Sequence, residues 1–172
     1  MRWMWIDRVL EHVPGERLVA VKAVSLAEEH LHDHFGAGDG GDLPLPVMPA
    51  SLIVEGMAQT AGILVGYAGQ FGEKVILAKV GRVELEHDAV AGDTLRYAAT
   101  MTRYDSAGAA TSGVVERFSP QAPGVAHPFG QIDLVFSHID RNMAGTIFPE
   151  HNFVFSDGFR TLLRTSGLEF DF

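Results

Sequence analysis

Cysteine is absent from the 172 residues of this chain, which excludes disulfides and thiolate metal sites. Long uninterrupted apolar runs are absent too. The longest run, over 52–68, is broken by Glu55, Gln59 and Thr60, so it does not predict a membrane span. Residues 1–8 reach an acidic side chain too early for the apolar region of a signal peptide. We therefore expect a fold held by packing alone, no membrane partner and a cytoplasmic location.

Positive charge is scarce. Lys and Arg number 13 against 22 Asp and Glu, which gives a net charge of −9 and argues against a nucleic-acid partner. An acidic partner would need a local basic patch, for which the candidates are Arg2, Arg8, Lys74, Lys79 and Arg82. Internal repeats and linkers are also missing, so the length predicts a single domain over 1–172, with 141–172 as a C-terminal extension containing a short helix.

Local patterns predict an α+β layout in which one long helix precedes an antiparallel meander. Residues 1–15 indicate a short amphipathic segment ending in a turn, and 26–47 indicate a polar, then glycine- and proline-rich loop. Strands are predicted over 17–25, 74–86, 95–103, 110–118 and 129–138, and helices over 49–70 and 158–166.

The long helix is apolar on nearly every face and should be wrapped by protein. Pro49 suits its first turn, and Ser51 can serve the free amides there. Glu55 and Gln59, four residues apart, share a face. An ionised carboxylate in such surroundings costs several kcal/mol unless it is paired, hydrogen-bonded or employed. The helix also contains four glycines, which we expect to let another backbone approach closely.

Two patterns ahead of the helix resemble ligand-binding motifs, but neither predicts a site. His30, His32 and His34 alternate and would share one face of a strand, but the surroundings favour a solvated loop, so we expect no metal site. The glycine-rich stretch 36–41 formally matches G-x-G-x-x-G. It follows a polar segment and precedes prolines where a helix should open, so we expect no dinucleotide and no other cofactor.

The remaining constellation is His34-Phe35 followed by Met48-Pro49, Glu55-Gly56-Met57-Ala58-Gln59, with Trp5-Ile6-Asp7-Arg8-Val9-Leu10 before it and Val90-Ala91-Gly92-Asp93 after it. In this order the motifs resemble those of the hotdog-fold 3-hydroxyacyl-[acyl-carrier-protein] dehydratases, over roughly residues 1–140. The chain departs from the family pattern in the longer segment 36–47, which replaces Pro-Gly after His-Phe, and in Ala50, where the family has glycine.

The resemblance implies a hotdog fold, in which a curved antiparallel sheet wraps one long central helix. It also implies a homodimer or higher homo-oligomer with sites between subunits, where the histidine of one chain faces the glutamate of its neighbour. The implied substrate is a 3-hydroxyacyl thioester on a phosphopantetheine carrier, either acyl carrier protein or coenzyme A, and the implied product is the trans-2-enoyl thioester.

The residue types suit that elimination. His34 can act as a neutral base near physiological pH, and Glu55 can act as the acid for the departing hydroxyl. Amides at the helix N-terminus, around Ala50 and Ser51, can polarise the thioester carbonyl. Gln59 is predicted to orient Glu55 rather than to react.

Two alternatives share this fold. A hotdog acyl thioesterase would use the same helix carboxylate to direct water at the thioester. A non-catalytic acyl-binding subunit would keep the fold without turnover.

Overall fold

The computed structural model describes residues 3–33, 46–139, 149, 152 and 154–168. Its elements are, in chain order, β1 (Arg8–Val13), β2 (Arg17–Ala23), α1 (Glu29–Asp33), α2 (Ala50–Ala68), β3 (Val75–Leu85), β4 (Thr94–Asp105), β5 (Gly108–Phe118), β6 (Ala126–His138) and α4 (Asp157–Thr165). In this part of the chain no helix is both long and apolar enough to cross a membrane.

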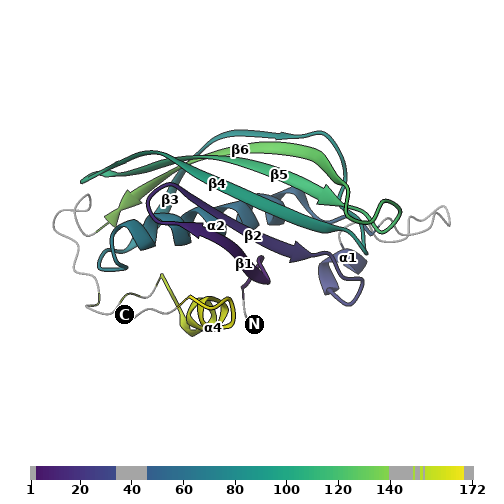
Figure 1. Ribbon diagram of the computed structural model, residues 1–172, viewed down its shortest axis with the longest axis horizontal. Helices are drawn as coiled ribbons and strands as arrows, with labels where there is room; N and C mark the ends of the chain where they lie inside the picture. The colour runs from purple at the N-terminus through teal and green to yellow at the C-terminus, as the bar shows by residue number, and fades with distance from the viewer. Residues whose placement is uncertain (1–2, 34–45, 140–148, 150–151, 153, 169–172) are drawn as a thin grey trace.

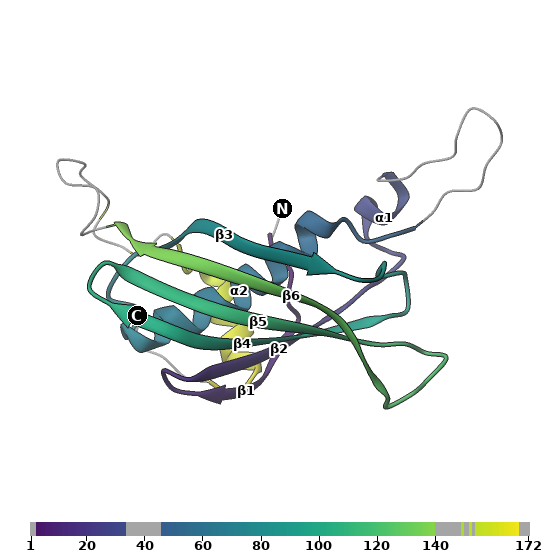
Figure 2. The same cartoon turned by 90° about the horizontal axis from the view of Figure 1, so that it is seen from above.

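The six strands form one antiparallel sheet in the order β1-β2-β4-β5-β6-β3. Figures 1 and 2 show this sheet arching over α2, which runs along its concave side. Tight turns fit the local sequence: Gly15 has φ +71° after β1, and the Asp105 carboxylate accepts the Ala107 N–H between β4 and β5. The predicted hotdog architecture is confirmed.

The core lies between the sheet and α2. On β6, Phe129, Ile132, Leu134 and Phe136 are all buried, and the last three alternate along the strand so that they share one face. Tyr97 on β4 is fully buried with its ring against α2.

At Gly56 and Gly66, α2 admits aromatic side chains rather than another backbone, and no backbone approaches Gly62 among the described residues, so that part of the prediction is wrong. A Cβ on Gly56 would lie 2.6 Å from Cζ of Tyr97, and one on Gly66 would lie 2.6 Å from Cζ of Phe155. At both positions the missing Cβ lets the aromatic ring pack directly against the helix backbone, closer than any larger residue would allow.

Three further local predictions need correction. Residues 8–13 form an edge strand rather than only a covering segment, because antiparallel pairing with β2 supplies hydrogen bonds that an isolated amphipathic segment lacks. The predicted loop at 26–47 contains the short helix α1. Pro49 is the N-cap residue of α2 rather than part of its first turn, and no side chain makes a capping hydrogen bond there, Ser51 included.

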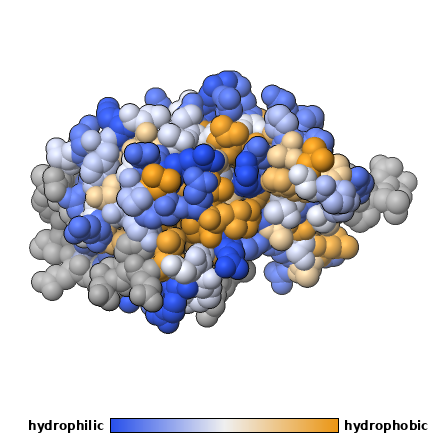
Figure 3. Space-filling model, viewed as in Figure 1, coloured by the Kyte–Doolittle hydropathy of each residue, from blue (hydrophilic) through white to orange (hydrophobic). Residues whose placement is uncertain are grey.

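The C-terminal helix of the described chain, α4, crosses the side of α2 that the sheet leaves open (Figures 1 and 2). Its buried side chains are Leu162 and Leu163, and the Ser166 hydroxyl after it accepts the Val9 N–H of β1 at 3.0 Å. The predicted short helix therefore exists, and the division into a domain and an extension stays a prediction. On the side of the molecule seen in Figure 1, apolar residues gather near the middle and toward the right, with hydrophilic residues around them (Figure 3).

Candidate active site

One stripe of α2 carries the predicted acidic residue and its neighbour. Glu55, Ala58, Gln59 and Gly62 follow the spacing i, i+3, i+4 and i+7, which places them on one side of the helix. Glu55 is only half-buried, so the expectation of a carboxylate wrapped on all sides is wrong and its desolvation is partial. Gln59 is 6% exposed, and its Nε2 donates a hydrogen bond of 2.9 Å to Oε1 of Glu55.

The backbone sets the orientation of the Gln59 amide. Oε1 accepts the Trp5 N–H at 2.8 Å, and Nε2 donates to the Trp3 carbonyl at 3.0 Å. An N–H can only donate and a carbonyl can only accept, so the reversed amide would break both bonds. Both protons of Nε2 are thus committed, one to Trp3 and one to Glu55. The predicted pairing of Gln59 with Glu55 is present, and the same side chain anchors the N-terminal segment to α2.

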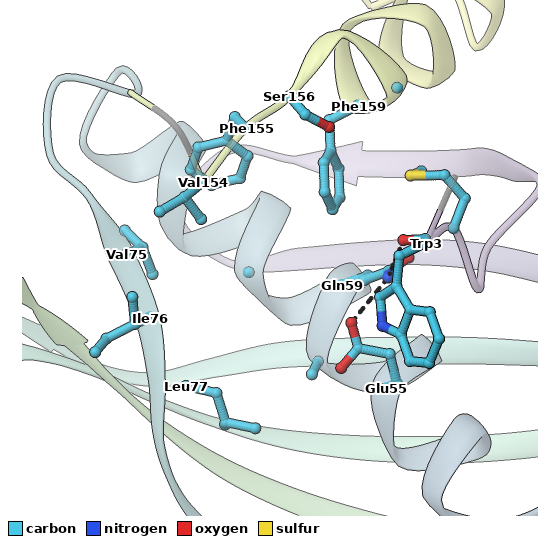
Figure 4. A pocket seen from close by; sticks show the side chains of 14 residues that line it. Trp3, Glu55, Gln59, Val75, Ile76, Leu77, Val154, Phe155, Ser156 and Phe159 are labelled. Carbon is cyan, nitrogen blue, oxygen red and sulfur yellow. Dashed lines mark hydrogen bonds between the residues drawn. The ribbon is translucent and has the colours of Figure 1, made fainter. Parts of the chain in front are cut away.

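A pocket of about 570 Å³ opens beside this stripe (Figure 4). Four groups of residues line it: Glu55, Ala58, Gln59 and Gly62 from α2; Val75, Ile76 and Leu77 from the start of β3; Trp3 and Met4 from the N-terminal segment; and Val154, Phe155, Ser156, Gly158 and Phe159 from the C-terminal segment. In Figure 4 the Phe159 ring hangs from α4 toward Gln59, and the Glu55 carboxylate lies beyond it. The pocket is therefore apolar over most of its wall, with its ionisable group at one side.

The start of α2 lies outside that pocket. Ala50 and Ser51 are exposed, and Ala50 lines a second pocket of about 390 Å³ together with Met48, Ile53 and Leu85. Ser51 lines neither pocket, although it stands one helical turn before Glu55 on the same side. The structure thus brings Glu55 and Gln59 together and holds the helix N-terminus about one turn away.

The remaining predicted site residue, His34, lies outside the described residues, as do Phe35 and the stretch 36–45. The aromatic wall of the pocket, contributed by Phe155 and Phe159 within residues 154–159, was not predicted from the sequence. The only signal for it was two phenylalanines four residues apart, Phe155 just before the predicted helix 158–166 and Phe159 within it.

The candidate basic patch is dispersed. Arg82 on β3 pairs with Glu84 at 2.5 Å, and this hydrogen bond lowers the pKa of that carboxyl group. Lys74 is 7% exposed and cannot belong to a surface patch, whereas Arg8 and Lys79 are exposed. Arg2 lies outside the described residues.

Solved structures similar to this chain share its fold. The dehydratase heterocomplex ApeI:P from Xenorhabdus doucetiae matches with a TM-score of 0.56 at 14% identity, covering 81% of this chain and 86% of that chain. A thioesterase family protein from Silicibacter pomeroyi matches with a TM-score of 0.56 at 12% identity, covering 76% and 82%. At such identities the likeness concerns the fold alone.

Sequence similarity reaches further. The chain is 38% identical over 97 residues to the 3-hydroxyacyl-[acyl-carrier-protein] dehydratase FabZ of Geobacter metallireducens. That alignment covers 55% of this chain and 60% of the relative, so the chain spans about three-fifths of the length of the curated protein it matches. The model of the FabA-like domain matches residues 2–117, which include β1 to β4, the candidate acid and most of β5. The resemblance found in the sequence is confirmed, and the chain belongs to the family of FabA-like domains.

Proposed function

We propose that this protein dehydrates 3-hydroxyacyl thioesters, carried on the phosphopantetheine arm of acyl carrier protein or coenzyme A, to trans-2-enoyl thioesters in fatty-acid-type metabolism. The observation that carries the proposal is Glu55, which lines an apolar pocket and is oriented by Gln59 within the motif Glu-Gly-Met-Ala-Gln. The similarity to a FabZ dehydratase supports it.

The hydrogen bonds of Gln59 suggest how Glu55 would act. Its Oε1 accepts from Gln59, so the other carboxyl oxygen is the one left to carry a proton toward the pocket. In the proposed reaction His34 takes the proton from the carbon next to the thioester carbonyl. The bond between the neighbouring carbon and its hydroxyl then breaks, Glu55 gives its proton to the departing hydroxyl, and water and the conjugated double bond form.

The start of α2 would hold the thioester carbonyl. Within the described chain α2 has no side-chain cap, and Ala50 and Ser51 are exposed there. Backbone N–H groups at a helix start favour the negative charge that develops on that oxygen during proton removal. Ser51 stands one turn from Glu55, or about 6 Å along the axis, so one substrate could span both groups.

A homodimer belongs to the proposal, because β3 is a free edge of the sheet. Leu77, Val80 and Val83 on this strand are 39%, 43% and 41% exposed. An exposed apolar edge invites pairing with another strand, and a second copy can satisfy it by placing its own β3 alongside. Light scattering after gel filtration tests this: the wild type should be dimeric and Val80→Lys should shift toward monomer. A monomeric wild type would contradict it.

The proposal also includes the cytoplasmic location predicted from the sequence.

The activity is tested with 3-hydroxyacyl-pantetheine thioesters, by following the absorbance of the conjugated enoyl product. Glu55→Gln keeps the shape of the side chain but removes the acid, so the rate should fall about 10²- to 10⁴-fold. Thr60→Val, which removes a buried hydroxyl that donates to the Gly56 carbonyl within the same helix, is the control and should keep the rate. Absence of enoyl product from the wild type, or full activity in Glu55→Gln, would refute the proposal. Release of free thiol without enoyl product would identify a thioesterase instead.

A further inference from the structure

The pocket floor is a helical stripe from which large side chains are missing. Past Glu55, the pocket side of α2 presents Ala58 and then Gly62, which stands seven residues or about 10 Å further along the axis. Among the described residues, a Cβ built on Gly62 would meet one atom outside the helix backbone within 4 Å, the ring carbon Cε1 of Phe136 at 3.8 Å, which is an ordinary van der Waals contact. The space over this glycine is therefore open, and it begins at the acid and runs along the helix.

One turn after Gly62, the same side of α2 is covered by aromatic rings. At Gly66 the position of a Cβ is taken by the rings of Phe155 and Phe71, at 2.6 and 2.7 Å. Phe155 is 3% exposed and contacts the Phe71 ring edge to face, with centroids 4.7 Å apart. The Phe159 ring stands beside it, 5.8 Å from Phe155 between centroids, and lines the pocket.

The segment that carries these rings is anchored at both ends. Asn152 donates through Nδ2 to the carbonyls of Phe71 and Glu73, at 3.0 and 3.1 Å, and its Oδ1 accepts the Val154 N–H. At the other end Leu162, on α4, is buried. The wall is thus a built part of the fold. It lies beyond residue 117, where the match to the FabA-like domain ends.

We propose that the C-terminal segment, through Phe155 and Phe159, forms the end wall of the acyl-binding pocket and sets the longest acyl chain that the protein accepts. This rests on the proposed function, since the acyl chain would enter beside Glu55. Apolar walls formed by α2, β3 and the segment suit an alkyl chain, and beyond Gln59 the one polar side chain among the described lining residues is Ser156.

The test uses two substitutions that change the pocket in opposite directions. Phe159→Ala removes a ring from the wall, and Gly62→Leu fills the floor at the open position. Binding is measured from the fluorescence of Trp3, which lines the pocket, with butyryl-, octanoyl- and palmitoyl-pantetheine as saturated probes. Each extra buried methylene is worth about fourfold in affinity. The ratio of palmitoyl to octanoyl affinity should therefore rise at least about tenfold in Phe159→Ala and fall in Gly62→Leu.

A control on the same helix separates a wall from general loosening. Leu162→Ala removes a buried side chain of α4 that does not line the pocket, so it should lower thermal stability and leave the chain-length ratio unchanged. An equal shift in Leu162→Ala, an unchanged ratio in Phe159→Ala, or no acyl-dependent fluorescence in the wild type would each overturn the proposal.

The two proposals can fail separately. Acyl binding that responds to Phe159→Ala, without enoyl product from any hydroxyacyl thioester, keeps the wall and removes the dehydratase. Enoyl formation with a chain-length profile that ignores both substitutions keeps the dehydratase and removes the wall.

Discussion

Replacing Gln59 by leucine tests whether one amide serves both the fold and the acid. Leucine is similar in size but removes three hydrogen bonds at once, to the Trp5 N–H, the Trp3 carbonyl and Oε1 of Glu55. We expect lower stability, a released N-terminal segment and a lower kcat from a single substitution.

The size of the stability loss follows from the surroundings of each lost partner. A net contribution of about 0.5–1.5 kcal/mol applies to each of the two bonds with backbone groups, and about 1.5–3 kcal/mol to a bond with a carboxylate. Trp3 is 56% exposed and Glu55 is half-buried, so water can replace part of what is lost. We therefore expect a fall of about 2–3 kcal/mol in the free energy of unfolding. For a chain of this length each kcal/mol lowers Tm by about 2–4 °C.

Thermal unfolding followed by circular dichroism measures the first effect, and a red shift of tryptophan emission in the folded state reports the release of Trp3 and Trp5. In the enoyl assay kcat should fall at least tenfold, because Glu55 is no longer oriented. Thr60→Val, one residue further on α2, should leave the emission and kcat unchanged. A Gln59→Leu protein with the Tm, emission and kcat of the wild type would show that these bonds hold neither the segment nor the acid.

Other predictions concern the core. Tyr97 is fully buried and its hydroxyl has no hydrogen-bond partner among the described residues, so Tyr97→Phe should raise the free energy of unfolding by about 1 kcal/mol in urea titrations. Burial raises the pKa of both Tyr97 and Tyr67, the latter to about 12. The free energy of unfolding should therefore be highest below pH 10, the ordinary tyrosine pKa, and fall as the pH rises above it. Ionisation of Tyr97 near pH 10 in the folded protein, seen as tyrosinate absorbance, would contradict this. Gly66→Ala should lower Tm through overlap with Phe155, whereas Gly62→Ala should preserve or raise it.

The fold was predictable where local pattern and tertiary packing agree. The alternation of Phe129–His138 and the turn residues between strands predict the meander, and the apolar stretch from Leu52 predicts the central helix. The edge strand β1 was missed because residues 8–13 expose much of their surface, and their strand form depends on pairing with β2, which no local pattern contains.

The site was predictable only in part, for the same reason. Helical spacing alone places Gln59 beside Glu55, and the observed hydrogen bond agrees. That Gln59 also holds Trp3 and Trp5 is a contact across more than fifty residues, which spacing cannot show. The wall at Phe155 depends likewise on where the chain returns after β6. The prediction for His34 is untested, since that residue lies outside the described part of the chain.

The glycines of α2 can be explained by two roles of this helix, which packs against aromatic rings of the core and also lines the pocket. Each glycine costs about 1 kcal/mol relative to alanine in a helix, so the three within Ala50–Ala68 need a compensating gain. At Gly56 the gain is the burial of Tyr97, and at Gly66 it is the burial of Phe155. Gly62 lies between them in sequence, lines the pocket and has no ring seated on it, so packing within the described chain supplies no gain there. A cost without a structural return, about two turns beyond the candidate acid, fits a position kept open for something that enters the pocket.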